Sequence, residues 1–188
     1  MPTRDACLEI RCPRCGGRAA FDEPFQFIPT GASKDRPLGE LKQWGGWYVR
    51  EKYPSVLRWK PPRGFGQYLF TGGGRSSGGY ALRRRGVVRC RECHLVAVHV
   101  LSWPGDAYFQ WNVRGTLLWA WDVNHARVLL HYVESTLRDP ARYPGYRRSL
   151  QKLPAAILAA RSRDTVARKI RGTLQAAGES ELAPDPAS

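Results

Sequence analysis

Acidic residues and long apolar runs are both scarce in this chain of 188 residues. Sixteen Asp and Glu stand against thirty Lys and Arg, which leaves a formal net charge of +14. The longest stretch without a charged residue, His94 to Gly105, has twelve residues and contains Pro104. A bilayer is spanned by about 20 apolar residues, so a transmembrane helix is excluded. We expect a basic protein that does not enter membranes.

The N-terminus also lacks a secretory signal. Its first ten residues alternate polar and apolar side chains and contain no apolar core, which predicts a cytoplasmic protein. In that reducing compartment, cysteines serve as metal ligands more often than as disulfides. Hydrophobic residues nevertheless make up 43% of the chain and charged residues 24%, which is typical of a folded protein. A chain of this length buries enough surface to fold without disulfides.

Four of the five cysteines form two C-x-x-C pairs, Cys12 with Cys15 and Cys90 with Cys93. Two such turns can supply the four thiolates of a tetrahedral structural zinc site. Gly16 follows the first pair, and its freedom to adopt a positive φ lets backbone N–H groups face the metal-bound sulfurs. The pairs resemble those of zinc-ribbon proteins, in which two such turns hold one ion between β-hairpins. The resemblance implies one structural Zn²⁺ bound by these four cysteines.

The spacing between the pairs departs from the ribbon pattern, because 74 residues separate them where about 15 to 20 are usual. We therefore interpret residues 18–86 as a loop-rich insertion carried by the ribbon. Two alternatives stay open. The run Cys90-Arg91-Glu92-Cys93-His94 also matches the attachment motif of c-type haem, and the cysteines can remain without metal or form disulfides. Cys7 is expected to be a small buried residue or an exposed thiol without a role.

The pattern after the second pair predicts an α+β fold, a small zinc-ribbon β domain followed by helices. Residues 87–89 are expected to form a short strand, and residues 95–101 and 107–114 a hairpin. Apolar residues at helical spacing predict a long helix from residue 115 to Pro140. We expect it to bury Leu118, Trp121, Leu129, Tyr132 and Val133.

Two further helices are expected near the C-terminus. One covers residues 147–161 and is interrupted by Pro154. The other runs from Asp164 as N-cap to Ala177 and ends at Gly178, with an apolar stripe formed by Val166, Ile170 and Leu174. The predicted organisation is a zinc ribbon over 1–114 with its insertion at 18–86, a region of about three helices over 115–178, and a disordered acidic tail over 179–188.

Positive charge is concentrated in two blocks, because residues 44–89 carry +9 and residues 138–171 carry +8. Such concentration is typical of proteins that bind polyanions. In the first block the cations alternate with aromatic rings on which bases can stack. The rings have a second interpretation, in which they fill the core of an insertion poor in aliphatic residues. We predict binding of DNA or RNA through Trp44, Trp47, Arg58, Trp59, Lys60, Arg63, Arg83, Arg84, Arg85, Arg147, Arg148, Arg163, Arg168 and Lys169.

Residues 162–170, with the sequence SRDTVARKI, resemble the start of the recognition helix in LacI-type helix-turn-helix proteins. The resemblance covers residues 155–170 and implies a helix that reads DNA. Arg161 stands where that family buries an apolar residue, Ala160 replaces its usual glycine, and Pro154 interrupts the first helix. We therefore favour a basic helical hairpin over a DNA-reading motif.

Catalytic groupings are scarce as well. The chain has no clustered carboxylates, no Ser-His-Asp order and no Cys-His nucleophile. Asp122 and His125 lie one turn apart, but His125 falls in the apolar stripe, where a hydrogen-bonded core histidine is expected. These features favour a protein without catalytic activity, although scattered catalytic residues leave an enzyme open. The alternative to nucleic-acid binding is a zinc-ribbon adaptor or subunit that docks on a larger protein or nucleoprotein assembly.

Overall fold

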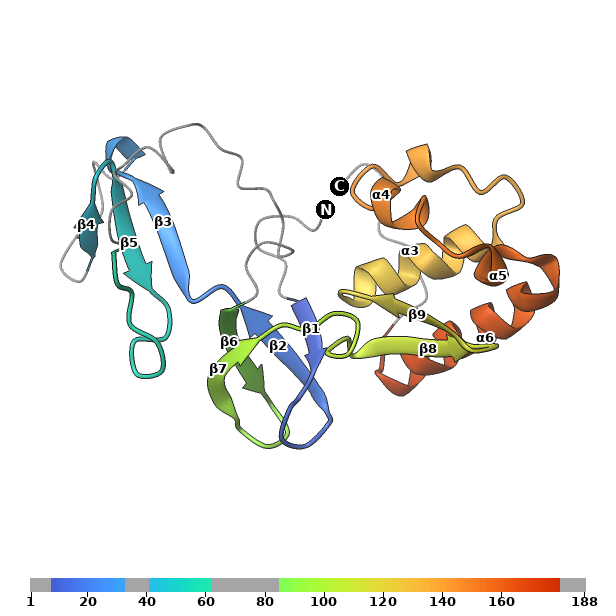
Figure 1. The fold of residues 1–188 in the computed structure, drawn as a ribbon, viewed down its shortest axis with the longest axis horizontal. Coiled ribbons are helices and arrows are strands. Elements are labelled where there is room, and N and C mark those ends of the chain that lie inside the picture. The colour runs from blue at the N-terminus through green and yellow to red at the C-terminus, as the bar shows by residue number, and fades with distance from the viewer. Residues whose placement is uncertain (1–7, 33–40, 62–84, 180–188) are drawn as a thin grey trace.

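The computed structural model describes residues 8–32, 41–61 and 85–179. Within these ranges the chain forms nine strands in three antiparallel sheets and four α-helices, and the helices all follow residue 122. Figure 1 shows the helices gathered around β8 and β9, at the opposite end of the molecule from β3, β4 and β5. The predicted α+β class is confirmed. Four residues of interest, Cys7, Arg63, Arg83 and Arg84, and the tail predicted beyond Glu179 lie outside the described residues.

The central sheet contains both cysteine pairs. Its strand order is β1-β2-β6-β7, formed by β1 (Leu8–Arg11), β2 (Arg18–Asp22), β6 (Arg85–Cys90) and β7 (Val96–Val100). Alternate residues of β1 and β2 are buried, so Ile10 and Phe21 lie on the face that covers a small core. Strand β2 and the start of β6 fall inside the range 18–86. The sheet therefore includes residues that we had assigned to the insertion.

A second sheet lies within the insertion, which we had expected to be rich in loops. It has the order β3-β5-β4, with β3 (Phe25–Pro29), β4 (Lys42–Trp44) and β5 (Trp47–Glu51), and a 3-10 turn at Thr30–Ala32 follows β3. Gly45 and Gly46 connect β4 to β5, and Gly45 has φ +58°, a value that glycine adopts without strain. Tyr53, two residues after β5, connects this sheet to the central one: its hydroxyl donates to the Asp22 carboxylate of β2, and the Arg89 guanidinium of β6 lies over its ring at 5.6 Å.

The third sheet is a hairpin that we predicted at the wrong position. Its strands are β8 (Phe109–Val113) and β9 (Thr116–Ala120), whereas we expected residues 107–114 to pair with 95–101 and residues 116–120 to begin the long helix. Arg114 and Gly115 both have positive φ, +51° and +80°, and such a two-residue turn sends the chain back along β8. The strand at 95–101 pairs with β6 instead.

The four helices are α3 (Val123–Glu134), α4 (Arg147–Leu150), α5 (Ala155–Leu158) and α6 (Ala160–Ala176), with a 3-10 turn at Pro140–Arg142. Pro154 precedes α5, so two short helices replace the single interrupted one that we expected. Helix α6 begins four residues before Asp164, so the predicted N-cap is wrong. Its end is as expected, because Gly178 has φ +70° and the Glu179 N–H donates to the Leu174 carbonyl at 2.9 Å.

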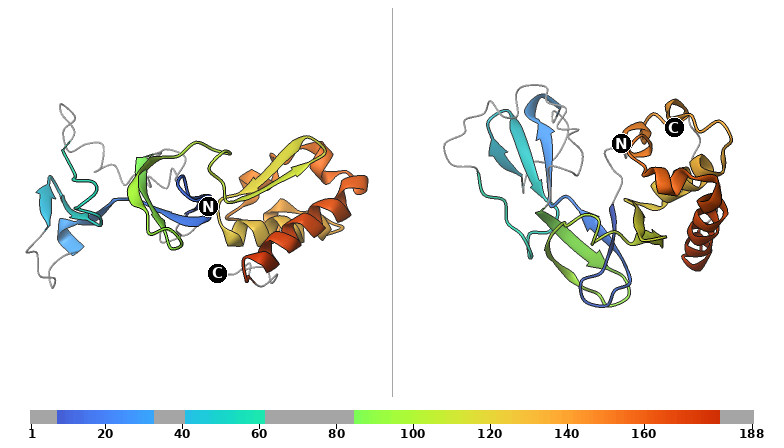
Figure 2. Two further views of the ribbon diagram at one scale, coloured as in Figure 1. Left: turned by 90° about the horizontal axis from the view of Figure 1, so that it is seen from below. Right: turned by 45° about the vertical axis from the view of Figure 1, so that its right-hand side comes forward.

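The main core lies between the inner face of the β8–β9 hairpin and the helices. Helices α3 and α6 lie side by side in both views of Figure 2, and they bury Leu129, Val133, Ile170 and Leu174 between them and the hairpin. Leu118, Tyr132 and Val166 are also buried, as predicted. Trp121 is only half-buried, contrary to expectation, because it faces the small core of the central sheet.

Glu9 joins the central sheet to the helices. Its carboxylate is ion-paired with Arg18 and accepts a hydrogen bond from the Val123 N–H at the start of α3, with an N–O distance of 2.6 Å. Arg18 also pairs with Glu179, just after α6, at 2.8 Å. Both ends of the helical region are therefore attached to the sheet that contains the cysteines. No helix in the described ranges is long and apolar enough to cross a bilayer.

Candidate metal centre and basic surface

The two C-x-x-C turns have matching backbone geometry. In each, the residue after the second cysteine adopts a left-handed conformation, with φ +77° at Gly16 and +57° at His94. In each, the N–H of the first cysteine donates to the carbonyl five residues ahead, at 2.8 Å for Cys12 and 2.9 Å for Cys90. His94 therefore occupies the same turn position as Gly16, and its side chain is exposed. This position accounts for the histidine that completed the haem-attachment motif.

Backbone N–H groups of the turns face the sulfurs. The Arg14 N–H lies 3.4 Å from the Cys12 sulfur. The residue after each left-handed position presents its own N–H to the second cysteine of the pair, as Gly17 does to Cys15 and Leu95 does to Cys93. Such N–H···S contacts stabilise thiolates. The Gly17 contact follows from the positive φ that we predicted at Gly16, and the Leu95 contact follows from the same conformation at His94.

The central sheet brings the two cysteine pairs together. The Cys12 and Cys93 sulfurs are 3.6 Å apart, the Cys15 and Cys90 sulfurs are also 3.6 Å apart, and all four lie within 4.8 Å of one another. A disulfide would require about 2.05 Å. A tetrahedral ion with metal–sulfur bonds of about 2.3 Å places its ligands about 3.8 Å apart. The four cysteines can therefore hold one metal ion, in an arrangement consistent with a zinc-ribbon-like site.

The thiols perturb each other's ionisation. Desolvation raises the pKa of Cys12, but the N–H groups of Cys15 and Arg14 outweigh it and lower this pKa to about 7. The Gly17 N–H favours the Cys15 thiolate, yet desolvation and the neighbouring sulfurs raise the pKa of Cys15 to about 12. Desolvation also raises the pKa of Cys93. Several thiolates at this spacing repel one another, so the arrangement is suited to a cation that compensates their charge.

Asp122 and His125, the pair considered for catalysis, have structural roles. The Asp122 carboxylate is the N-cap of α3 and accepts a hydrogen bond from the His125 N–H at 2.7 Å. His125 is 3% exposed, and its ring stacks on those of Trp121 and Tyr146, with centroid distances of 4.3 and 5.2 Å. Its Nδ1 accepts from the Trp121 N–H, so its Nε2 carries the proton and donates to the Ser149 hydroxyl. His125 is a hydrogen-bonded core histidine, as expected.

Burial lowers the pKa of His125 from 6.5 to about 3. Between these values the unfolded chain binds a proton that the folded protein does not, so the free energy of unfolding falls as the pH falls. We expect this histidine to remove about 2 kcal/mol between pH 7 and pH 5. Urea unfolding at both pH values measures this change. The free energy of unfolding should fall less between pH 7 and pH 5 in His125→Gln than in the native protein. If His125→Gln lost as much free energy of unfolding between the two pH values as the native protein does, this account of His125 would be wrong.

The aromatic residues that we predicted to bind nucleic acid contact other residues of the insertion. Trp44 and Trp59 meet edge to face with centroids 5.7 Å apart, and the Trp59 N–H donates to the Glu51 carboxylate at 2.6 Å. Trp47 is half-buried and lies opposite Trp44 across the β4–β5 pair. Arg58 pairs with Glu51 at 3.3 Å. These contacts support the interpretation in which the rings fill a local core.

The predicted cationic contacts of the helical region are mostly exposed. Arg147 and Arg148 are exposed on α4, Arg168 and Lys169 are exposed on α6, and Arg163 is half-buried. Arg85 at the start of β6 and Lys60 are exposed as well. Three further cations of the +8 charge block are exposed in the same region, although we did not predict them as contacts: Arg142, Lys152 and Arg161.

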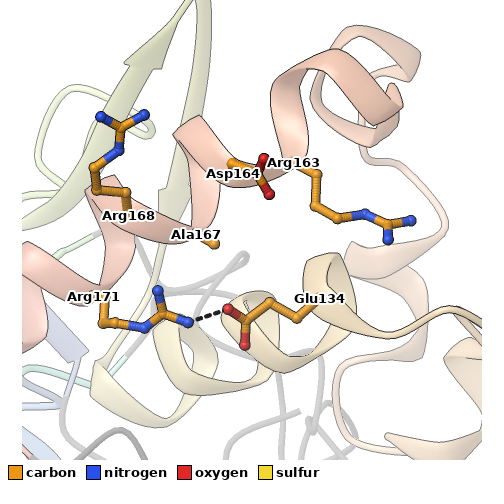
Figure 3. Close-up of a pocket in the computed structure, with 6 residues that line it drawn as sticks. All are labelled: Glu134, Arg163, Asp164, Ala167, Arg168 and Arg171. Carbon is orange, nitrogen blue, oxygen red and sulfur yellow. Dashed lines mark hydrogen bonds and ion pairs between the residues drawn. The ribbon is translucent and has the colours of Figure 1, made fainter.

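Three arginines line an open hollow between α3 and α6, together with Glu134, Asp164 and Ala167 (Figure 3). Arg171 is ion-paired with Glu134 there. The guanidinium groups of Arg163 and Arg168 point away from one another (Figure 3). The hollow therefore does not gather its cations around one small ligand, and they belong to the wider basic surface.

The segment that resembles a LacI-type recognition helix lies in α5 and α6. Helix α5 has a single turn, and Ser162, which opens the matching motif, is buried within the first turn of α6. Arg161 and Arg168 are exposed on α6, seven residues apart and so on one side of it. No protein-family model, curated protein or solved structure matches this chain.

Proposed function

We propose that this protein binds nucleic acid through its helical region and that one zinc ion stabilises its central sheet. The choice of zinc rests on the donor set, because four thiolates in tetrahedral positions favour zinc or iron. An iron–sulfur cluster divides the four cysteines among two or four irons and spreads the sulfurs apart, whereas these four lie within 4.8 Å. All four positions of the ion are filled by protein, so the zinc is structural and takes no part in catalysis.

The observation that carries the proposal is a set of exposed cations without acidic partners. Other cations are paired with specific acids: Lys42 with Glu51, Arg18 with Glu9, and, within the helical region, Arg171 with Glu134. Within the described part of the helical region, seven exposed cations form no ion pair: Arg142, Arg147, Arg148, Lys152, Arg161, Arg168 and Lys169. Such uncompensated charge is suited to phosphates, whose bound counterions are released on contact.

Helix α6 is the centre of this surface. It buries Val166 and Ile170 against α3, so its position is fixed, while Arg161, Arg168 and Lys169 face solvent. Gly172 is also exposed and allows a phosphate backbone to approach the helix closely. Contacts of this kind position a protein on nucleic acid without reading its sequence. The inserted sheet contributes less in this proposal, because its acids and rings engage one another.

Arg161→Ala/Arg168→Ala/Lys169→Ala tests the proposal. The native protein should bind a duplex with an affinity that falls steeply as salt rises, at about 0.9 in log–log slope per phosphate contact. Removing three contacts should flatten the slope by about 2.7 and weaken binding to unrelated sequences alike. Fluorescence anisotropy over a salt series measures both quantities. Because all three side chains are exposed, thermal unfolding should be nearly unchanged.

Arg58→Ala is the matched control, since this cation is already paired with Glu51. It should leave the salt slope of the native protein unaltered. If the zinc-loaded protein binds neither DNA nor RNA at low salt, the nucleic-acid proposal fails. In that case the adaptor function would replace nucleic-acid binding as the proposed function, because the basic surface is also suited to an acidic protein.

A further inference from the structure

The central sheet has one covered edge and one open edge. At β1, the Glu9 N–H donates to the Trp121 carbonyl at 2.9 Å and the Arg11 N–H donates to the Asp106 carbonyl at 2.7 Å. At the opposite edge, β7 pairs with β6 on one side only, and no other described residue forms backbone hydrogen bonds with it. Open edges are sites at which another strand can add. Among the described residues, β7 is therefore the uncovered edge of this sheet.

Strand β7 is apolar where it faces solvent. Its sequence, VAVHV, places Val96, Val98 and Val100 on one face, and Val96 and Val100 are 47% and 59% exposed. Ala97 and His99 point to the other face, where His99 pairs with Asp106 at 3.0 Å. Natural proteins protect open edges with lysine, proline or a bulge. Strand β7 has none of these, so its exposed face is suited to pairing.

From this edge we infer that β7 pairs antiparallel with β7 of a second copy of the chain. The three valines are placed symmetrically about Val98. A two-fold interface requires such symmetry, because each copy contributes the same surface to it. With the axis at Val98, each Val96 lies opposite Val100 of the other copy, and the two Val98 residues face each other. Any shift of this register leaves valines without a partner. The product is one continuous sheet of eight strands.

The charge around β7 is compatible with a second copy. Arg85 lies beside Val100 and Arg89 beside Val96 on the same face, because these residues are register partners. Across the two-fold axis, Arg85 of one copy and Arg89 of the other are separated by three strand spacings, about 14 Å. That distance exceeds the Debye length of about 8 Å at physiological salt. The long-range repulsion between two chains of +14 remains, so higher salt strengthens the dimer.

Sedimentation over a concentration series tests the dimer, with the zinc-loaded full chain. In about 1 M salt, where the Debye length is about 3 Å, the native protein should approach twice its 21.2 kDa mass. Val100→Lys should remain monomeric, because a lysine on the edge blocks strand addition. Leu137→Lys is the matched control: Leu137 is 73% exposed outside the sheet, and this variant should dimerise like the native protein.

A native protein that stays monomeric at every concentration in high salt overturns the inference. So does a dimer that persists in Val100→Lys, since that dimer must use another surface. The inference is independent of the proposed function, and the two are distinguished by salt, which weakens nucleic-acid binding and strengthens the dimer. Val100→Lys should accordingly retain the native salt slope of nucleic-acid binding per chain.

The register gives a second test. In a Cys7→Ser background with zinc bound, Val98→Cys should form a disulfide between copies on mild oxidation, because the two-fold axis brings the two residues 98 together. Val96→Cys alone should not, since its neighbour in the other copy is Val100. Combining Val96→Cys with Val100→Cys should restore the cross-link. Equal cross-linking of both single variants would rule out this register.

Discussion

Cys90→Ser is expected to release the metal ion and to unfold the central sheet. A serine hydroxyl does not replace the thiolate, and the free energy of zinc binding, on the order of 10 kcal/mol, is free energy of folding. The ion also closes the long loop between the two pairs, so its loss removes a constraint on the insertion. Metal analysis should fall from one zinc per chain towards none, and the melting temperature should fall with it.

Hydrogen exchange locates the effect of Cys90→Ser. Protection should be lost in β1, β2, β6 and β7, and also in β3 and β5, which contact the central sheet through Tyr53 and its partners Asp22 and Arg89. Helices α3 and α6 should keep much of their protection, because their core is a separate cluster. Cys7→Ser is the control and should retain its zinc. Full zinc content in Cys90→Ser would mean that this cysteine is not a ligand.

Leu118→Ala is expected to lower the free energy of unfolding by about 2 to 5 kcal/mol. Leu118 is 3% exposed on the inner face of the β8–β9 hairpin, opposite Trp111, and packs in the cluster that contains α3 and α6. Truncation leaves a cavity that the rigid hairpin and helices cannot fill completely. Chemical denaturation, followed by far-ultraviolet circular dichroism, measures the loss.

Leu117→Ala provides the matched comparison, with the same chemical change one residue earlier. Leu117 is 40% exposed on the outer face of the hairpin, so its truncation should cost well under 1 kcal/mol. The contrast follows from the alternation of side chains along a strand. Similar losses in both variants would show that the hairpin does not present Leu118 to the core.

The long helix begins at Val123 and not at residue 115, which shows that a local hydrophobic pattern was not enough to place its start. Leu118 and Trp121 fit helical spacing, and the same residues fit a strand followed by a helix start. The decision came from Arg114 and Gly115, whose positive φ values turn the chain, and from Asp122, whose carboxylate caps α3. The N-cap expected at Asp164 was wrong for a related reason. Pro154 and the short α5 allow α6 to begin at Ala160, so Asp164 lies within the helix.

The aromatic residues of the insertion illustrate a second limit. Their alternation with cations fits both base stacking and a local core, since Trp and Tyr serve either purpose. The edge-to-face contact between Trp44 and Trp59 and the bond from the Trp59 N–H to Glu51 depend on how β4 and β5 fold back on each other. These contacts join residues from different parts of the folded insertion, so they cannot be read from its amino-acid composition.

The sequence by itself determined the local properties of this protein: two C-x-x-C turns with a left-handed residue after the first, a strongly positive charge, a helical C-terminal region and the end of α6 at Gly178. Each depends on the conformational or ionic preference of a few neighbouring residues. Only the tertiary structure decided that β2 pairs with β6, which brings the Cys12 and Cys93 sulfurs to 3.6 Å. The tertiary structure also decided which acid pairs with each cation and which strand forms the open edge of the central sheet. Ion pairs and strand pairing both join residues that are distant in the chain.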